Sequence, residues 1–150
     1  MSCQTAIVYG FGFSIDCDDA TLIEFIKNHK DAFCGNNAEK ELYKEICDNE
    51  DVDLYDILAD YACENTGREG PYAVVSNIMS RETNIDFSYE PGDADCGSDP
   101  AILLPETMPW FLNETEKALT KESLTGIYEK YMNELGIKEK PDYVKIEYFG

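Results

Sequence analysis

The sequence has few of the residues from which active sites are usually built. Its 150 residues include one histidine and no G-x-S-x-G, H-E-x-x-H or glycine-rich phosphate-binding motif. The Gly-Phe-Gly run at residues 10–12 does not complete a dinucleotide-binding fingerprint, because Ile15 occupies the position of the third glycine. These absences predict a protein that is not an enzyme. A small carboxylate-dependent enzyme is an alternative, because a pair of carboxylates is enough for some hydrolases.

Closely spaced metal ligands and membrane-spanning segments are also missing. The six cysteines include no C-x-x-C pair, so they predict reduced thiols rather than a disulfide framework, and neither a metal nor a cofactor is expected. The first residues lack a basic segment followed by an apolar core, and no apolar run reaches the roughly 18 residues of a membrane span. We therefore expect no signal peptide, no membrane anchor and a cytoplasmic location.

Cationic residues are scarce relative to acidic ones. Lysine and arginine together number 12 and aspartate and glutamate 31, which gives a formal net charge of −19 and an isoelectric point near 4.1. Such a charge repels nucleic acid and anionic membranes, whereas it attracts a basic protein in a salt-dependent manner. Two simpler explanations are solubility and a host whose proteins are generally acidic. Hydrophobic residues still make up 43% of the chain, which is enough for one folded domain over residues 1–150.

The strongest charged segment is residues 48–64, which contain no lysine or arginine. Leu54 and Leu58 follow helical spacing and predict an amphipathic helix over residues 51–64. Acidic residues occupy another face of this helix and the segment that leads into it. The predicted partner-binding residues are Asp48, Glu50, Asp51, Asp53, Asp56, Asp60 and Glu64. The competing interpretation is a solvated outer helix face without a binding role.

A second acidic segment lies between two expected strands. The turn residues of 90–100 predict a loop, in which Asp93, Asp95 and Asp99 form a secondary partner-binding set. The spacing does not fit an EF-hand, because its twelfth position is Leu104 and its glycine falls one place early. Another oxygen-ligand site is an open alternative, although a solvated hairpin loop is favoured.

Periodicity and turn residues together predict an α+β fold. Gly10 and Gly12 in the first strand leave room for a helix packed closely against it. Strands are expected at residues 5–15, 85–89, 101–104 and 143–149, and helices at residues 19–34, 38–47, 51–64, 71–82, 113–119 and 120–135. This pattern predicts a mostly antiparallel sheet, built from the terminal strands and a central hairpin, packed with about four to six helices. The last strand is expected beside the first.

Three isolated features have both a structural and a functional interpretation. Asp16 and Asp18 precede a helical pattern and are expected to cap it, with metal binding as the alternative. His29 stands among lysines on the polar side of that helix, so it is expected on the surface rather than as a catalytic base. Trp110 is expected in the core, and an exposed binding residue is the second interpretation.

A nucleic-acid mimic requires more carboxylates than one helix face provides. A helix returns a side chain to the same face about every 5.4 Å, whereas the phosphates of one DNA strand are about 3.4 Å apart. Residues 53–64 would therefore need a second acidic row beside them. Two sources are expected, namely Glu39, Glu41 and Glu45 in the preceding helix, or the loop of residues 93–99.

In size, acidity and lack of catalytic motifs, the chain resembles the acidic inhibitors with which bacteriophages block host nucleases. These are the anti-restriction and anti-CRISPR proteins that mimic nucleic acid. The chain is similar in the same respects to immunity proteins that neutralise basic nuclease toxins. The resemblance implies a non-enzymatic inhibitor whose partner is a basic nucleic-acid-binding protein, with no direct contact to nucleic acid or membrane. An immunity-type protein is the alternative function.

Overall fold

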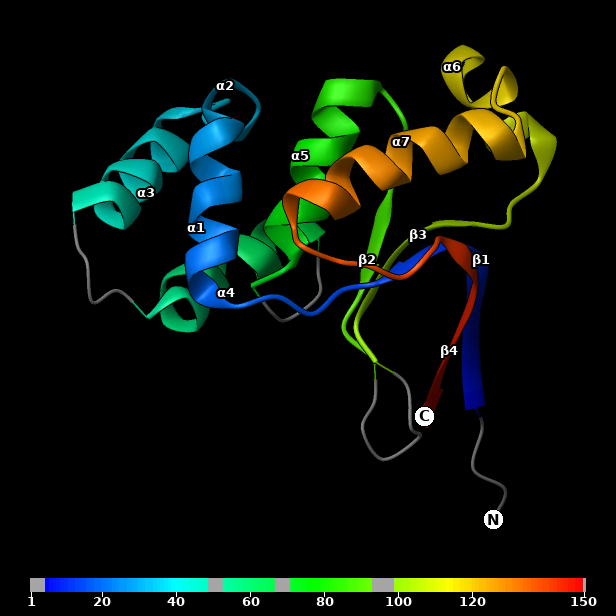
Figure 1. Ribbon diagram of the computed structural model, residues 1–150, viewed down its shortest axis with the longest axis horizontal. Coiled ribbons are helices and arrows are strands. Elements are labelled where there is room, and N and C mark those ends of the chain that lie inside the picture. The colour runs from blue at the N-terminus through cyan, green and yellow to red at the C-terminus, as the bar shows by residue number, and fades with distance from the viewer. Residues whose placement is uncertain (1–4, 49–52, 67–70, 93–98, 150) are drawn as a thin grey trace.

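A four-stranded antiparallel sheet forms one layer of the molecule (Figure 1). Its strands are β1 (Thr5–Ser14), β2 (Ser88–Glu90), β3 (Ala101–Pro105) and β4 (Asp142–Phe149), in the order β2-β3-β1-β4. The computed structural model describes residues 5–48, 53–66, 71–92 and 99–149, without the side chains of residues 5–6, 60, 62–66 and 147–149. The central hairpin β2–β3 and the pairing of the last strand with the first are both confirmed.

Helices gathered beside the sheet form the second layer (Figure 1). In the described ranges these are α1 (Asp19–Asn28), α2 (Lys30–Phe33), α3 (Asn37–Asp48), α4 (Leu54–Thr66), α5 (Ala73–Thr83), α6 (Glu114–Lys117) and α7 (Lys121–Glu134), with a 3₁₀ turn, η2, at Pro109–Phe111. The predicted α+β class is confirmed. The helix expected at residues 19–34 divides in two because the backbone of His29 leaves the helical region, with φ −117° and ψ 34°.

One part of the core, which also extends among α1 to α5, lies between α7 and the aromatic face of the sheet. Tyr128 of α7 has its ring centroid 5.7 Å from Phe11, 5.5 Å from Phe13 and 5.4 Å from Phe87. Its hydroxyl donates a hydrogen bond of 2.6 Å to the carbonyl of Phe11, so the one polar atom of this side chain is satisfied. Burial raises the pKa of Tyr128 far above its ordinary value, which keeps the phenol neutral. Burial of these rings anchors α7 to the sheet.

Strand β3 packs closely against two glycines of β1. A Cβ atom at Gly10 would overlap the backbone carbonyl of Leu104, and one at Gly12 would overlap that of Ile102. The close neighbour of both glycines is therefore a strand, and the expectation of a helix at this place was wrong. Glycine is required here because the approach of β3 leaves no space for a side chain.

The helices are joined by an ion pair that includes a buried carboxylate. Glu39 of α3 is only 2% exposed, and its carboxylate lies 2.9 Å from the guanidinium of Arg81 in α5. The same guanidinium group donates to the carbonyls of Ala32 and Phe33 at 2.9 and 3.2 Å. Arg81 thus holds α2, α3 and α5 together. Because Glu39 is buried and paired, its expected place in a second acidic row was wrong.

Of the helices in the described ranges, none combines the length and apolar character that crossing a bilayer requires.

Candidate functional site

Three segments that are distant in sequence each carry exposed carboxylates. We call these residues the acidic surface: Asp16, Asp18 and Asp19 between β1 and α1, Asp53 and Asp56 at the start of α4, and Asp99 before β3. Two of the segments are joined directly, since the N–H of Ile15 donates to the carbonyl of Pro100 at 2.9 Å. Asp16 and Asp99 line the same cavity of about 670 Å³, in which Lys138 is the nearby cation.

Tyr72 fixes the segment that carries the first three of these aspartates. Its hydroxyl donates to the carbonyl of Cys17 at 2.8 Å and accepts from the N–H of the same residue at 3.2 Å, so it fixes the connection that carries Asp16 to Asp19. Burial raises the pKa of Tyr72, and the negative charges of Asp16 and Asp19 raise it further. The phenol is therefore the neutral centre of an electronegative region.

Tyr89 extends this region toward α4. Burial raises its pKa to about 12, and the nearby groups of Tyr72, Tyr55 and Glu90 contribute to the shift. Tyr55 lies between Asp53 and Asp56 in the sequence, which places the beginning of α4 on the same side of the molecule as Tyr72. Tyr55 and Tyr72 are therefore both near Tyr89.

Asp18 is held in its ionised form at the start of α1. Its carboxylate accepts a 2.8 Å hydrogen bond from the N–H of Thr21, and this bond lowers the pKa of Asp18. The expectation that Asp18 caps the helix is confirmed. Burial, followed by the charges of Asp18, Asp16 and Asp19, raises the pKa of the neighbouring Cys17 thiol to about 11. The thiol therefore reports the strength of the local negative potential.

Asp53 and Asp56 occupy the exposed start of α4. Asp53 accepts hydrogen bonds from the N–H of Tyr55 at 3.1 Å and of Asp56 at 3.5 Å, so it caps this helix. A negative charge at a helix N-terminus is favourable, and the carboxylate stays fixed in position. Asp53 therefore caps the helix while it remains exposed to solvent. Asp56 takes part in this capping only through its backbone N–H.

The structure describes only some of the other predicted partner-binding residues. Asp48 is exposed at the end of α3. Asp60 and Glu64 lie within α4, but their side chains are outside the described set. Glu50, Asp51, Asp93 and Asp95 lie outside the described residues, so the expected loop cluster is represented by Asp99 alone. Glu41 and Glu45 are exposed on α3.

A simple sequence signal would have identified Asp16, Asp18 and Asp19 as part of the acidic surface. Lysine and arginine are absent from residues 1–26, 45–67 and 82–116. The acidic surface draws one segment from each of these cation-free stretches. The interpretation of Asp16 and Asp18 as helix caps, with metal binding as the alternative, did not consider this common property, although capping and surface charge are compatible roles.

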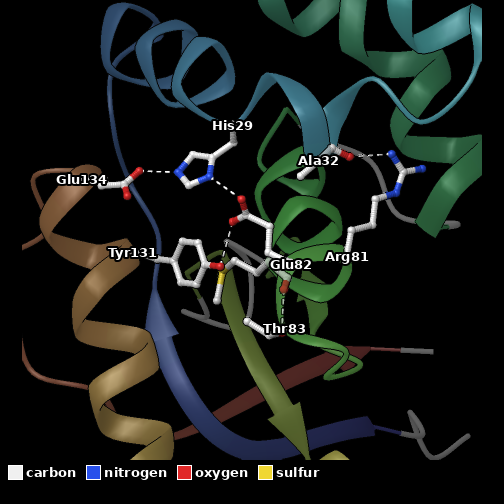
Figure 2. A network of polar contacts seen from close by, with 8 residues as sticks. His29, Ala32, Arg81, Glu82, Thr83, Tyr131 and Glu134 are labelled. Carbon is white, nitrogen blue, oxygen red and sulfur yellow. Dashed lines mark hydrogen bonds and ion pairs between the residues drawn. The ribbon is translucent and has the colours of Figure 1, made fainter.

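His29 is buried between two glutamates, as Figure 2 shows. Its Nδ1 lies 2.9 Å from Glu82 of α5, and its Nε2 lies 2.5 Å from Glu134 of α7. Tyr131 donates to the other oxygen of Glu82 at 2.8 Å. The expectation of a solvated surface histidine was wrong. Both ring nitrogens are engaged with carboxylates, so neither is available to accept a proton from a substrate in this arrangement.

Burial alone would lower the pKa of His29. The hydrogen bonds and negative charges of Glu82 and Glu134 outweigh burial, so the pKa is raised above its ordinary value. The favoured form is an imidazolium that donates to both carboxylates. This arrangement joins the junction of α1 and α2 to α5 and α7, which is a structural role.

Trp110 is fully outside the core. The side chain is 72% exposed, so the expected core position was wrong. The second interpretation is correct as far as the exposure of the residue is concerned. It lies in η2, between the end of β3 and α6, and therefore away from the acidic surface at the start of β3.

Within the described residues, no group of three or more histidine, cysteine, aspartate or glutamate side chains is arranged to hold a metal ion. Comparison of the chain with protein-family models, curated proteins and solved structures gives no match. Any functional assignment therefore depends on the chain's own residues.

Proposed function

We propose that this protein is a non-enzymatic acidic inhibitor that occupies the basic nucleic-acid-binding site of a nuclease-type protein. The observation that carries the proposal is that Asp16 and Asp99, which come from two cation-free stretches, line one cavity, and we infer that Asp53 and Asp56 extend the same surface. Its carboxylates would take the positions of phosphates in the partner's basic groove, because such grooves bind nucleic acid mainly through charge. Binding would exclude nucleic acid by occupying the same space.

The arrangement of the acidic surface supports mimicry better than the α4 stripe alone. One helix face carries too few carboxylates to match a phosphate backbone, so a second row is needed. Asp16, Asp18 and Asp19 provide a second row that does not come from α4. Asp18 and Asp53 are fixed by backbone hydrogen bonds, so little side-chain freedom would be lost on binding.

The proposed mode of binding has a characteristic dependence on salt. Long-range attraction between the acidic protein and a basic partner accelerates their encounter, and added salt screens it. Because the partner's phosphate-binding groups would be covered, duplex DNA or RNA should compete with the inhibitor for the same site. An immunity-type protein bound at another surface of a nuclease would show no such competition.

The experiment captures partners from a cell lysate on the immobilised protein and elutes them in parallel with salt and with an excess of duplex DNA. The proposal predicts capture of a basic nucleic-acid-binding protein that both treatments release. A captured nuclease that salt releases but DNA does not would favour the immunity-type alternative. Capture limited to proteins without nucleic-acid-binding activity would contradict the proposal.

A further inference from the structure

Trp110 and Phe111 form a fixed apolar projection. Their side chains are 72% and 71% exposed, higher fractions than those of the other exposed large hydrophobic residues in the described ranges. The turn that carries them is closed by hydrogen bonds from the N–H of Phe111 to Met108, at 3.0 Å, and of Leu112 to Pro109, at 3.2 Å. The two ring centroids are 6.2 Å apart. This turn exposes two adjacent aromatic rings to solvent. Such a pair of exposed rings is unusual on the surface of a monomer.

The projection is also anchored on its C-terminal side. Asn113 and Glu116 form a reciprocal capping box at the start of α6, with bonds of 2.8 and 2.9 Å between side chains and backbone. Asn113 further donates to the carbonyl of Asn84 at 2.9 Å. The exposed rings are thus attached to a segment that is tied to the end of α5.

A carboxylate-lined cavity adjoins Phe111. It has a volume of about 530 Å³ and lies between α5, β2 and the end of β3. Asp86, Glu106 and Glu116 line it together with serine and asparagine side chains, and neither lysine nor arginine is among its described lining residues. Its size is in the range of cavities that hold a ligand or a large side chain.

Glu116 is a fixed acceptor in this cavity. The residue is 8% exposed, and one carboxylate oxygen accepts from the N–H of Asp86 at 2.9 Å while the other accepts from the N–H of Asn113 at 2.9 Å. Asp86 and Glu106 are exposed at the cavity's margin. The cavity therefore favours a cationic group, and its carboxylates match the planar, forked donors of a guanidinium.

We propose that Trp110, Phe111 and this cavity form a docking surface for a protein segment that carries an arginine between apolar side chains. The arginine would enter the carboxylate-lined cavity, and its apolar neighbours would cover the two exposed rings. Charge complementarity selects this occupant, and the aromatic rings can add cation–π contact with a guanidinium. Aromatic residues with an adjoining charged pocket are typical of the residues that dominate binding energy.

This docking surface goes beyond the proposed function, and although Tyr89 lines its cavity, its carboxylates are distinct from those of the acidic surface. The two lie at opposite ends of β3, which has five residues, and Asp99 precedes its first residue while Glu106 follows its last. A strand of this length spans roughly 17 Å. Each surface can therefore be altered without the other.

The test uses a capped synthetic peptide with a central arginine between two leucines, and two matched peptides. One has citrulline, a neutral analogue, in place of arginine, and the other has serine in place of both leucines. Trp110 is the single tryptophan of the chain, so its fluorescence and its quenching by acrylamide report contact directly. The arginine–leucine peptide should shield Trp110 and bind about tenfold more tightly than either matched peptide, because each lacks one of the two contacts.

Variants of the protein locate the contact by calorimetry. Trp110→Ala and the pair Asp86→Asn with Glu106→Gln should each weaken binding of the arginine–leucine peptide, and the charge pair should leave citrulline-peptide binding unchanged. Tyr143→Ala, which removes an exposed aromatic ring elsewhere on the sheet, is the matched control and should bind normally.

Three results would overturn the docking surface. Equal binding of the arginine and citrulline peptides, or an arginine–leucine peptide that leaves Trp110 unshielded, would remove its chemical basis. Loss of peptide binding in Asp16→Asn with Asp99→Asn, but not in the Trp110 and Asp86 variants, would place the peptide on the acidic surface. That outcome would contradict the docking surface while leaving the proposed inhibitor function intact.

Discussion

The Nδ1 atom of His29 lies 2.9 Å from a carboxylate oxygen of Glu82, although the two residues are 53 positions apart in the sequence. Glu134 binds the other ring nitrogen. The side chain of His29 is 8% exposed, and those of the two glutamates are about a third exposed at 31% and 30%. Three helical segments therefore meet at one imidazolium whose charge is set by pH.

Replacing His29 with glutamine should lower stability most strongly in mildly acidic solution. The pKa of His29 is raised in the folded protein, so its contribution is complete below the ordinary unfolded value of 6.5 and is lost as pH rises through the folded value. We expect a loss of about 2 kcal/mol at pH 6 for His29→Gln, and a smaller loss at pH 9. Denaturant unfolding of both proteins at the two pH values measures this difference. A loss that grows with pH would contradict an imidazolium between the two glutamates.

Gly12→Ala should destabilise the sheet, whereas Gly126→Ala should stabilise α7. A Cβ at Gly12 would overlap backbone atoms of β3, but one at Gly126 would meet no atom within 4 Å. We expect a loss of about 3 kcal/mol at Gly12 and a gain of about 1 kcal/mol at Gly126, because alanine favours a helix. Unfolding by urea compares both variants with the native chain. Equal effects would show that β3 does not approach β1 as closely as described.

Cys17 should react slowly with iodoacetamide, and removal of nearby carboxylates should accelerate the reaction. Burial and the charges of Asp18, Asp16 and Asp19 raise the pKa of the Cys17 thiol to about 11, so the reactive thiolate is scarce at pH 8. Asp16→Asn with Asp19→Asn should increase labelling about threefold, which corresponds to half a pKa unit. Peptide mass spectrometry measures the rate, with Glu41→Gln and Glu129→Gln together as a control of equal net charge. An unchanged rate in the double variant would mean that these carboxylates do not act on Cys17.

Much of the fold followed from local patterns. Alternating apolar residues predicted β1 and β4, and the glycine- and proline-rich segment before β3 predicted the central hairpin. The cap at Asp18 was also predictable, because capping depends on residues within one helical turn. Such features depend only on residues that are close in sequence, which is why the α+β class was predicted correctly.

Features that depend on distant residues were not predictable in this way. His29 stands beside lysines, yet the helix breaks at this residue and its side chain meets Glu134, which is 105 positions away. Glu39 fits the polar face of an amphipathic helix, but Arg81 holds it in the interior. Trp110 is exposed although large aromatic residues usually lie inside. Local hydrophobicity does not encode these tertiary contacts.

The candidate site was predicted in part for the same reason. Asp53 and Asp56 were identified from the density of carboxylates along α4, which is a local property. Asp16 and Asp19 come from another part of the chain and act on Tyr72, which together with Tyr55 lies near Tyr89. Only the folded chain brings those three tyrosines together.

The most direct test of the inhibitor proposal compares two variants with the same net charge. Asp16→Lys, Asp56→Lys and Asp99→Lys together reverse the acidic surface without altering the caps formed by Asp18 and Asp53. Glu41→Lys, Glu45→Lys and Glu129→Lys reverse three exposed carboxylates outside that surface. Both variants, once shown to be folded by circular dichroism, are used beside the native chain to capture partners from lysate. We predict that the control variant retains a basic nucleic-acid-binding partner and that the acidic-surface variant loses it. Equal capture by the two variants would contradict the proposed function.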